Sequence, residues 1–161
     1  LGFATACWGE QEREFQYVAV DALRAGAGHL GAADLPAVRR LIETKSWWDT
    51  VDGLAAWVVG PLVSAHPQLA TEMDRWIDDD NMWVARSAIL HQLGYKERTE
   101  PARLFGYADK RAEDTEFFIR KALGWALRQY ARVDPDAVRS YLDANTDRLS
   151  GLTVREASKH L

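Results

Sequence analysis

The chain has 161 residues, 47% of them hydrophobic and 27% charged, and its formal net charge is −4. This length and composition are typical of one globular domain with a sizeable core, which we expect to cover residues 1–161. The single cysteine, Cys7, excludes an internal disulfide and indicates a reducing, cytoplasmic location. The most apolar run, residues 54–63, is too short to span a bilayer, so we expect no membrane association.

The predicted elements are all helices, because apolar residues recur at helical spacing and no run of β-branched residues alternates. In chain order, helices are expected at residues 15–23, from 34 onward, at 47–59, 67–77 and 81–93, after 101, at 114–130 and 134–144, and from 153 onward. Gly60-Pro61 is expected to end the helix at 47–59, and Ser46/Asp49 and Thr153/Glu156 are expected to be capping boxes. Successive amphipathic helices predict an all-α fold, an α-solenoid of stacked helical hairpins, with a compact helical bundle as the structural alternative.

Residues 46–52 (SWWDTVD) place two adjacent tryptophans and two carboxylates at an expected helix start. Trp48 and Asp52 are four residues apart and therefore share one helix face. An indole beside an acid suits the binding of a cation better than the filling of a core, because burial of an unpaired Asp52 would be costly. The simpler alternative is that the tryptophans are packing residues and the acids stabilise the helix start.

Arg86 lies one turn into the helix expected at 81–93, three residues after Trp83. Its guanidinium could lie against that indole or contact a phosphate through two hydrogen bonds. The alternative is a surface arginine paired with residues 78–80, which are all aspartates.

Lys121, Trp125 and Arg128 are spaced i, i+4 and i+7, so they form one helical stripe with an aromatic ring between two cations. A nucleic-acid groove needs charge for phosphates and an aromatic face for a base or sugar. Gly124 costs a helix roughly 1 kcal/mol, which indicates close approach by another element or a ligand. The alternative is that Trp125 is a core residue and both cations are solvated. The negative net charge argues only weakly against a nucleic-acid partner, because basic residues can gather on one surface.

Motifs for metal or nucleotide chemistry are absent from the sequence. The four histidines are scattered, and there is no Gly-rich phosphate loop, no Gly-x-Ser-x-Gly elbow and no His-Glu-x-x-His motif. We therefore expect no cofactor and no metal site.

Several separate segments, in the right order, resemble the AlkD family of DNA alkylation-repair glycosylases. They are residues 45–52 (KSWWDTVD), 80–86 (DNMWVAR), 88–93 (AILHQL), 95–96 (YK), 117–119 (FFI), 121–125 (KALGW) and 127–128 (LR). The resemblance runs from about Glu10 to Ala157, nearly the whole chain. It implies a solenoid of HEAT-like repeats curved around duplex DNA, and removal of 3-methyladenine, 7-methylguanine and related positively charged purine adducts.

The resemblance also implies site residues, cleavage with the lesion still stacked in the duplex, and further N-terminal helices that this chain lacks. We expect a monomer whose partner is double-stranded DNA with alkylated bases, in the bacterial cytoplasm and associated with the nucleoid. The catalytic residues that we expect are Asp52, Trp48 and Trp125, and the expected DNA-binding residues are Arg86, Lys121, Arg128 and Trp47. The resemblance implies all of these except Lys121 and Trp47, which we add from the sequence pattern.

Two other functions remain open at this point. The same solenoid could bind damaged or distorted DNA as a non-catalytic module. Alternatively, it could be a scaffold for protein interactions, which the negative net charge would favour and which predicts no affinity for duplex DNA at low salt.

Overall fold

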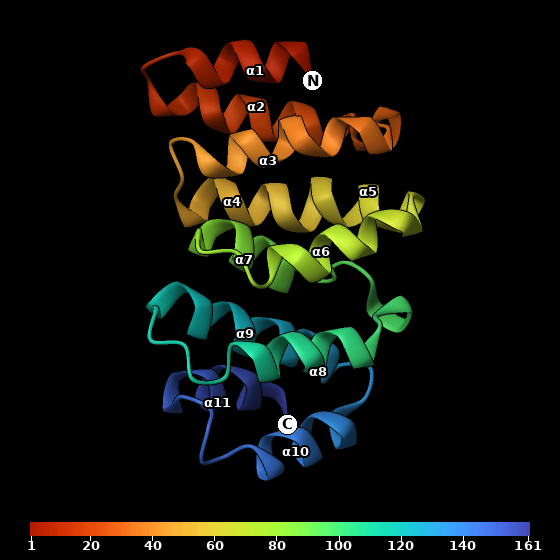
Figure 1. The fold of residues 1–161 in the computed structure, drawn as a ribbon, viewed down its shortest axis with the longest axis vertical. Helices are drawn as coiled ribbons and strands as arrows, with labels where there is room; N and C mark the ends of the chain where they lie inside the picture. Colours follow the sequence, from red (N-terminus) through yellow and green to blue (C-terminus); the bar gives the residue numbers. More distant parts are fainter. The chain divides into compact units, whose positions relative to one another are not determined.

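The structure is a computed structural model that describes every residue from Leu1 to Leu161, and it is helical throughout with no strand (Figure 1). The expectation of an all-α fold of helical repeats is therefore confirmed. The chain divides into two compact units, Leu1–His91 and Gln92–Leu161, and each is described by itself. Short 3-10 turns cover Ala27–His29, Ala32–Asp34, Pro67–Leu69, Lys96–Arg98 and Ser158–His160.

The first unit stacks helices in successive pairs. Its helices are α1 (Gly2–Gly9), α2 (Arg13–Ala25), α3 (Leu35–Glu43), α4 (Trp48–Leu54), α5 (Gly60–Ala65), α6 (Ala70–Trp76) and α7 (Met82–Leu90). Helix α1 packs on α2, α2 packs on α4, and α4 packs on α7, and Figure 1 shows them as consecutive layers. Val38, Ile42, Leu54 and Met73 are fully buried between these layers, because apolar residues recur on the inner face of each helix.

Helix α4 does not end at Gly60-Pro61, so that expectation is wrong. A π-helical turn, Ala55–Val59, joins α4 directly to α5, which carries Pro61 in its first turn. A wider turn just before a proline relieves the clash between its ring and the carbonyl four residues back. Gly60 serves a different purpose: a Cβ there would lie 2.3 Å from the backbone oxygen of His91, so the glycine lets the end of α7 approach.

Both helix starts that were expected to be capping boxes are built differently. The Ser46 hydroxyl donates back to the Ile42 carbonyl at 2.5 Å, and α4 begins at Trp48 without a side-chain cap. The last helix begins earlier than expected, because Ser150 accepts a hydrogen bond from the Thr153 backbone N–H at 3.0 Å. Asn81 caps α7 in the same way through the Trp83 N–H, at 2.9 Å.

The second unit contains α8 (Pro101–Lys110), α9 (Phe117–Tyr130), α10 (Pro135–Ala144) and α11 (Gly151–Ala157). Helix α9 is its centre, because α8, α10 and α11 all pack against it. Ile119, Leu123 and Leu127 point into this core and are at most 2% exposed. The expected helix at 134–144 is confirmed, and Asp134 caps it by accepting from the Ala137 N–H at 2.9 Å.

Gly124 is the point at which α11 reaches α9 most closely. A Cβ at this position would lie 2.4 Å from the Glu156 Cβ and 2.9 Å from the Thr153 carbonyl oxygen. The expectation that Gly124 marks a close approach is confirmed, and the approaching element is α11. In neither unit is a helix both long enough and apolar enough to cross a membrane.

Candidate functional site

Asp52 on α4 and Arg86 on α7 form a two-point ion pair in the first unit. Arg86 Nε donates to Asp52 Oδ1 and Nη2 donates to Oδ2, both at 2.7 Å. Parallel hydrogen bonds of this kind fix the planes of both groups as well as their separation. The packing of α4 on α7 thus joins two side chains that are 34 residues apart in the sequence and gives the carboxylate one defined orientation.

Burial is unequal within this pair. The Arg86 side chain is only 1% exposed, whereas the Asp52 side chain keeps 20% of its surface accessible. A guanidinium buried to this extent needs a carboxylate partner, and Asp52 supplies it. The alternative of a surface arginine paired with residues 78–80 is therefore wrong. The phosphate contact expected of Arg86 stays a prediction that this burial does not favour, since the guanidinium faces Asp52 instead of solvent.

The two tryptophans at the start of α4 are exposed. Trp47 and Trp48 keep 48% and 46% of their surface accessible, so neither is a core residue. Trp48 lies one helical turn before Asp52, on the same side of α4. The Trp47 ring contacts Trp83 on α7, with centroids 5.9 Å apart and planes tilted by 56°. The exposed indole of Trp48 therefore shares one side of α4 with an oriented carboxylate.

Asp49 belongs to a separate network that sequence reasoning did not find. Its Oδ2 accepts from the Tyr17 hydroxyl at 2.7 Å, and its Oδ1 accepts from Arg13, whose Nη1 also donates to the Lys45 carbonyl at 2.7 Å. Burial acts to raise the pKa of Asp49, but hydrogen bonds from Tyr17 and Arg13 outweigh it and lower that pKa. Lys45 adopts a left-handed backbone conformation with φ 52°, which is uncommon for a non-glycine residue.

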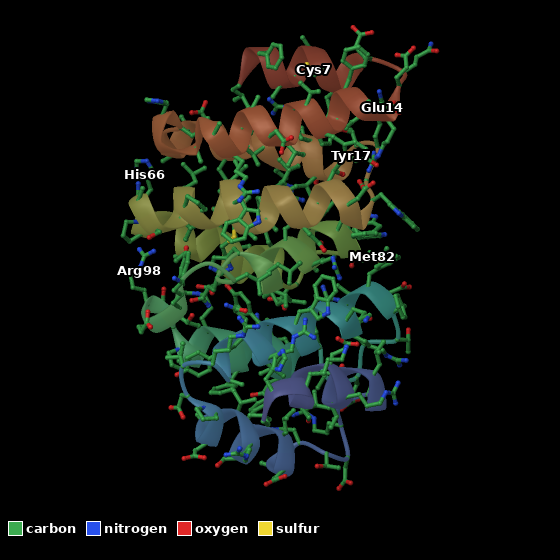
Figure 2. All side chains as sticks on the ribbon, turned by 180° about the vertical axis from the view of Figure 1, so that it is seen from behind. Cys7, Glu14, Tyr17, His66, Met82 and Arg98 are labelled. Atoms are coloured by element: carbon green, nitrogen blue, oxygen red, sulfur yellow. The ribbon has the colours of Figure 1, made fainter.

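The Asp49 network anchors the loop before α4 to helix α2. Figure 2 places Tyr17 and Met82 at the same end of the first unit, the end at which α2, α4 and α7 all begin. Holding Lys45 in its unusual conformation fixes the direction in which the chain enters α4. The two exposed tryptophans that follow are therefore carried on a constrained segment and not on a loose loop.

The second unit brings its basic stripe together around one acid. Glu156 accepts from Lys121 Nζ at 2.8 Å, from the Trp125 indole N–H at 3.2 Å and from Arg128 Nη1 at 3.2 Å. Lys159 Nζ donates to both carboxylate oxygens at 2.9 Å. The Lys121 ammonium also lies 5.7 Å from the centre of the Trp125 ring. The alternative of simply solvated cations is wrong, because each of them is paired with Glu156.

Glu156 is well buried, with 8% of its side chain exposed. Hydrogen bonds from Lys121 and Lys159 lower its pKa to about 2, although burial acts in the opposite direction. Sequence reasoning placed Glu156 in a helix cap and missed both its role and Lys159. Gly124 was the available signal, because a glycine in the middle of a cationic helix face marks where a second helix must touch that face.

No group of three or more histidine, cysteine, aspartate or glutamate side chains is arranged to hold a metal ion. The polar chemistry that the two units offer is thus an oriented carboxylate with indole faces in the first and a carboxylate-centred cation cluster in the second. The first arrangement can stabilise positive charge that develops on a bound molecule. The second can attract anions.

Two comparisons with known proteins found matches, and both matches are described as DNA alkylation repair enzymes, one of them as a predicted one. A solved structure described as a predicted DNA alkylation repair enzyme from Enterococcus faecalis matches with a TM-score of 0.91 and 32% sequence identity. The match covers 99% of this chain and 74% of that chain. A family model described as DNA alkylation repair enzyme matches residues 1–161, so the chain belongs to that family. Comparison with curated proteins found no match.

Proposed function

We propose that this protein is a DNA glycosylase that excises positively charged alkylated purines, such as 3-methyladenine and 7-methylguanine, from duplex DNA. Membership of a DNA alkylation repair family makes DNA the substrate to consider. The observation that carries the proposal is the oriented Asp52 carboxylate, one turn after the exposed indole of Trp48. Such a pair is suited to stabilising a cation that exists only in the transition state.

In the proposed reaction the alkylated base is a good leaving group without further protonation. Alkylation at N3 of adenine or N7 of guanine places a positive charge on the base. When the bond between C1′ and the base nitrogen breaks, its electron pair goes to the base, which leaves as a neutral molecule. Positive charge then develops on the deoxyribose until the oxygen of a water molecule attacks C1′ and a proton is released. The products are the free alkylated base and an abasic site.

Asp52 is assigned the stabilisation of the sugar cation. Each carboxylate oxygen has two lone-pair directions, and Arg86 occupies one on each oxygen. The remaining directions and the 20% exposed surface are available to the developing cation and to the attacking water. Arg86 is assigned the holding of that geometry, so it acts as a positioning residue.

The indole faces are assigned the second part of the stabilisation. The faces of aromatic rings carry partial negative charge and attract cations, by about 2 kcal/mol where water is excluded. Trp48 has the exposure this role needs. Trp125 is assigned the same role because residues 121–128 resemble the family pattern. A separate variant, Trp125→Ala, tests this assignment. We also propose cleavage of the stacked lesion without base flipping, as the resemblance to the AlkD family implies.

The test is direct measurement of base release. Duplex DNA methylated with a simple alkylating agent is incubated with the protein, and the supernatant is chromatographed for free 3-methyladenine and 7-methylguanine. The proposal predicts both bases in the supernatant and alkali-labile abasic sites in the DNA. Binding of methylated duplex without base release would instead support a non-catalytic module, and no binding at low salt would support a protein scaffold.

A further inference from the structure

In the cation cluster of the second unit, three positively charged side chains share one carboxylate. Glu156 lies on α11 and receives hydrogen bonds from Lys121 and Arg128 on α9 and from Lys159, which follows α11. Three positive charges against one negative charge leave a local excess of two positive charges. This excess is concentrated in a protein whose net charge is −4.

The acid and the cations differ in their access to solvent. The Glu156 side chain is 8% exposed, whereas Lys121, Arg128 and Lys159 are 26%, 25% and 50% exposed. An incoming anion therefore meets N–H donors first, and the carboxylate lies behind them. Both Lys and Arg have more donors than these contacts use, and a phosphate offers several acceptor oxygens to such a group.

We propose that Glu156 is a positioning residue that orders Lys121, Arg128 and Lys159 into a preformed clamp for one backbone phosphate of duplex DNA. The inference rests on the proposed function only in taking duplex DNA as the ligand. It adds Lys159 to the binding residues and gives Glu156 a role that does not require contact with the DNA.

The ordering by Glu156 matters because lysine and arginine side chains are flexible. Fixing such a side chain on binding costs conformational entropy, which weakens binding. The Glu156 carboxylate fixes three of them before DNA arrives, and the Gly124 contact fixes the carboxylate itself, since α11 lies directly on α9 there. The clamp should therefore bind phosphate better than the same charges on mobile side chains.

Glu156→Gln separates this inference from simple electrostatics. The substitution removes one negative charge, so charge alone predicts tighter DNA binding with a steeper dependence on salt. Loss of positioning predicts the opposite: affinity for a labelled, unmodified duplex falls roughly 3- to 10-fold, and the slope of log affinity against log salt becomes shallower by up to about 0.9, the contribution of one phosphate. Equal or tighter binding by Glu156→Gln would overturn the proposal.

Two readouts separate positioning from general destabilisation. A lower folded fraction reduces affinity at every salt concentration by the same factor and leaves the slope unchanged. The indole N–H resonance of Trp125, assigned by its disappearance in Trp125→Phe, should shift in Glu156→Gln because its acceptor has changed. An unshifted Trp125 resonance in a folded Glu156→Gln variant would also contradict the proposal.

Lys159→Gln tests the clamp without disturbing a buried residue, and it serves even if Glu156→Gln fails to fold. Its matched control is Arg139→Gln on α10, because the Arg139 side chain is 52% exposed and the charge change is the same. We expect Lys159→Gln to flatten the salt dependence and Arg139→Gln to leave it unchanged. Equal slopes in the two variants would overturn the clamp. The clamp is tested by duplex binding and the glycosylase proposal by base release, so either proposal can fail without the other.

Discussion

Arg86 and Asp52 share two hydrogen bonds of 2.7 Å, yet the arginine is almost completely buried while the acid keeps one-fifth of its side chain exposed. This asymmetry means that the arginine is directed at the acid, and the acid is directed partly at solvent. The buried guanidinium therefore holds the exposed edge of the Asp52 carboxylate in one fixed position, where a bound molecule can reach it. Stability alone would not require it, since buried ion pairs add little compared with apolar residues of the same volume.

Asp52→Asn should abolish most base excision while leaving the DNA affinity of the folded protein intact. Because it leaves the buried Arg86 guanidinium without an anionic partner, the variant should also be less stable, and excision is compared per folded molecule. Loss of one group that stabilises transition-state charge typically lowers the rate by about 10²- to 10³-fold, and asparagine keeps the size of the side chain. Excision is measured by alkaline cleavage of abasic sites in methylated duplex, followed by gel electrophoresis. Asp136→Asn, at a 90% exposed acid on α10, is the control that changes charge elsewhere. Equal strand breakage in Asp52→Asn and the unmodified protein would remove Asp52 from the mechanism.

Arg86→Lys should lower the excision rate by about 10-fold or more without a matching loss of DNA affinity. Lysine keeps the charge but cannot form the parallel pair, so Asp52 loses its fixed orientation. The comparison requires single-turnover excision rates alongside duplex binding at several salt concentrations. If excision is unchanged while affinity and salt slope both fall, Arg86 contacts a phosphate, as its position in the sequence allowed, and does not position Asp52.

Trp48→Ala should reduce excision by about 30-fold, which corresponds to the roughly 2 kcal/mol expected of a cation–π contact. Because Trp48 is 46% exposed, the fold should remain intact. Trp57→Ala is the matched control, since Trp57 is 43% exposed in the π-helical turn between α4 and α5 and is not part of the proposed chemistry. Trp125→Ala should also lower the rate. Similar rates for Trp48→Ala and Trp57→Ala would show that the Trp48 indole is not specifically required.

Glu156 should make the protein sensitive to acid. Its pKa is about 2 in the folded protein, below the usual value of 4.5, so its ionised form stabilises the folded state. That contribution is complete above about pH 4.5 and is lost as the pH falls toward 2. Glu156→Gln should therefore be destabilised at pH 7 and lose less stability than the unmodified protein between pH 7 and pH 3. Urea unfolding at both pH values measures this, with Glu113→Gln, at a 77% exposed acid, as control.

The helices were largely predictable from sequence because they depend on local patterns. Helices were expected at residues 15–23 from apolar spacing and at 134–144 from an Asp-Pro start, and the structure has helices there, α2 at Arg13–Ala25 and α10 at Pro135–Ala144. The continuation through Gly60-Pro61 was missed, because a π-helical turn is invisible in a hydrophobic pattern. The position of Gly60 against His91 depends on a helix that comes much later in the chain.

The pairing of side chains was far less predictable, because it depends on which helices touch. Trp48 and Asp52 were identified together since they lie on one helix. The partner of Asp52 lies 34 residues away and the partners of Glu156 on α9 lie 28 to 35 residues away, so only the packing of helix on helix reveals them. The acids of the two expected capping boxes show the same effect: Asp49 accepts hydrogen bonds from side chains of α2, and Glu156 accepts them from side chains of α9.

Gly124→Ala should destabilise the protein by about 1–3 kcal/mol, the range typical of inserting an extra carbon into a packed core. A Cβ at this position meets the Glu156 Cβ at 2.4 Å and the Thr153 backbone at 2.9 Å, so α11 would have to move away from α9. Gly106→Ala on α8 is the matched control. A Cβ there meets nothing within 4 Å, and alanine should stabilise that helix by roughly 0.5–1 kcal/mol.

The Gly124→Ala variant also connects stability with the phosphate clamp. If α11 shifts, Glu156 can no longer reach Lys121 and Arg128 in their present positions, so duplex affinity should fall together with stability. In Gly106→Ala, stability should rise while affinity stays constant. Chemical denaturation gives the stability of each variant, and fluorescence anisotropy with a labelled duplex gives the affinity. A Gly124→Ala protein with unchanged stability and affinity would show that the contact between α9 and α11 is looser than the structure describes.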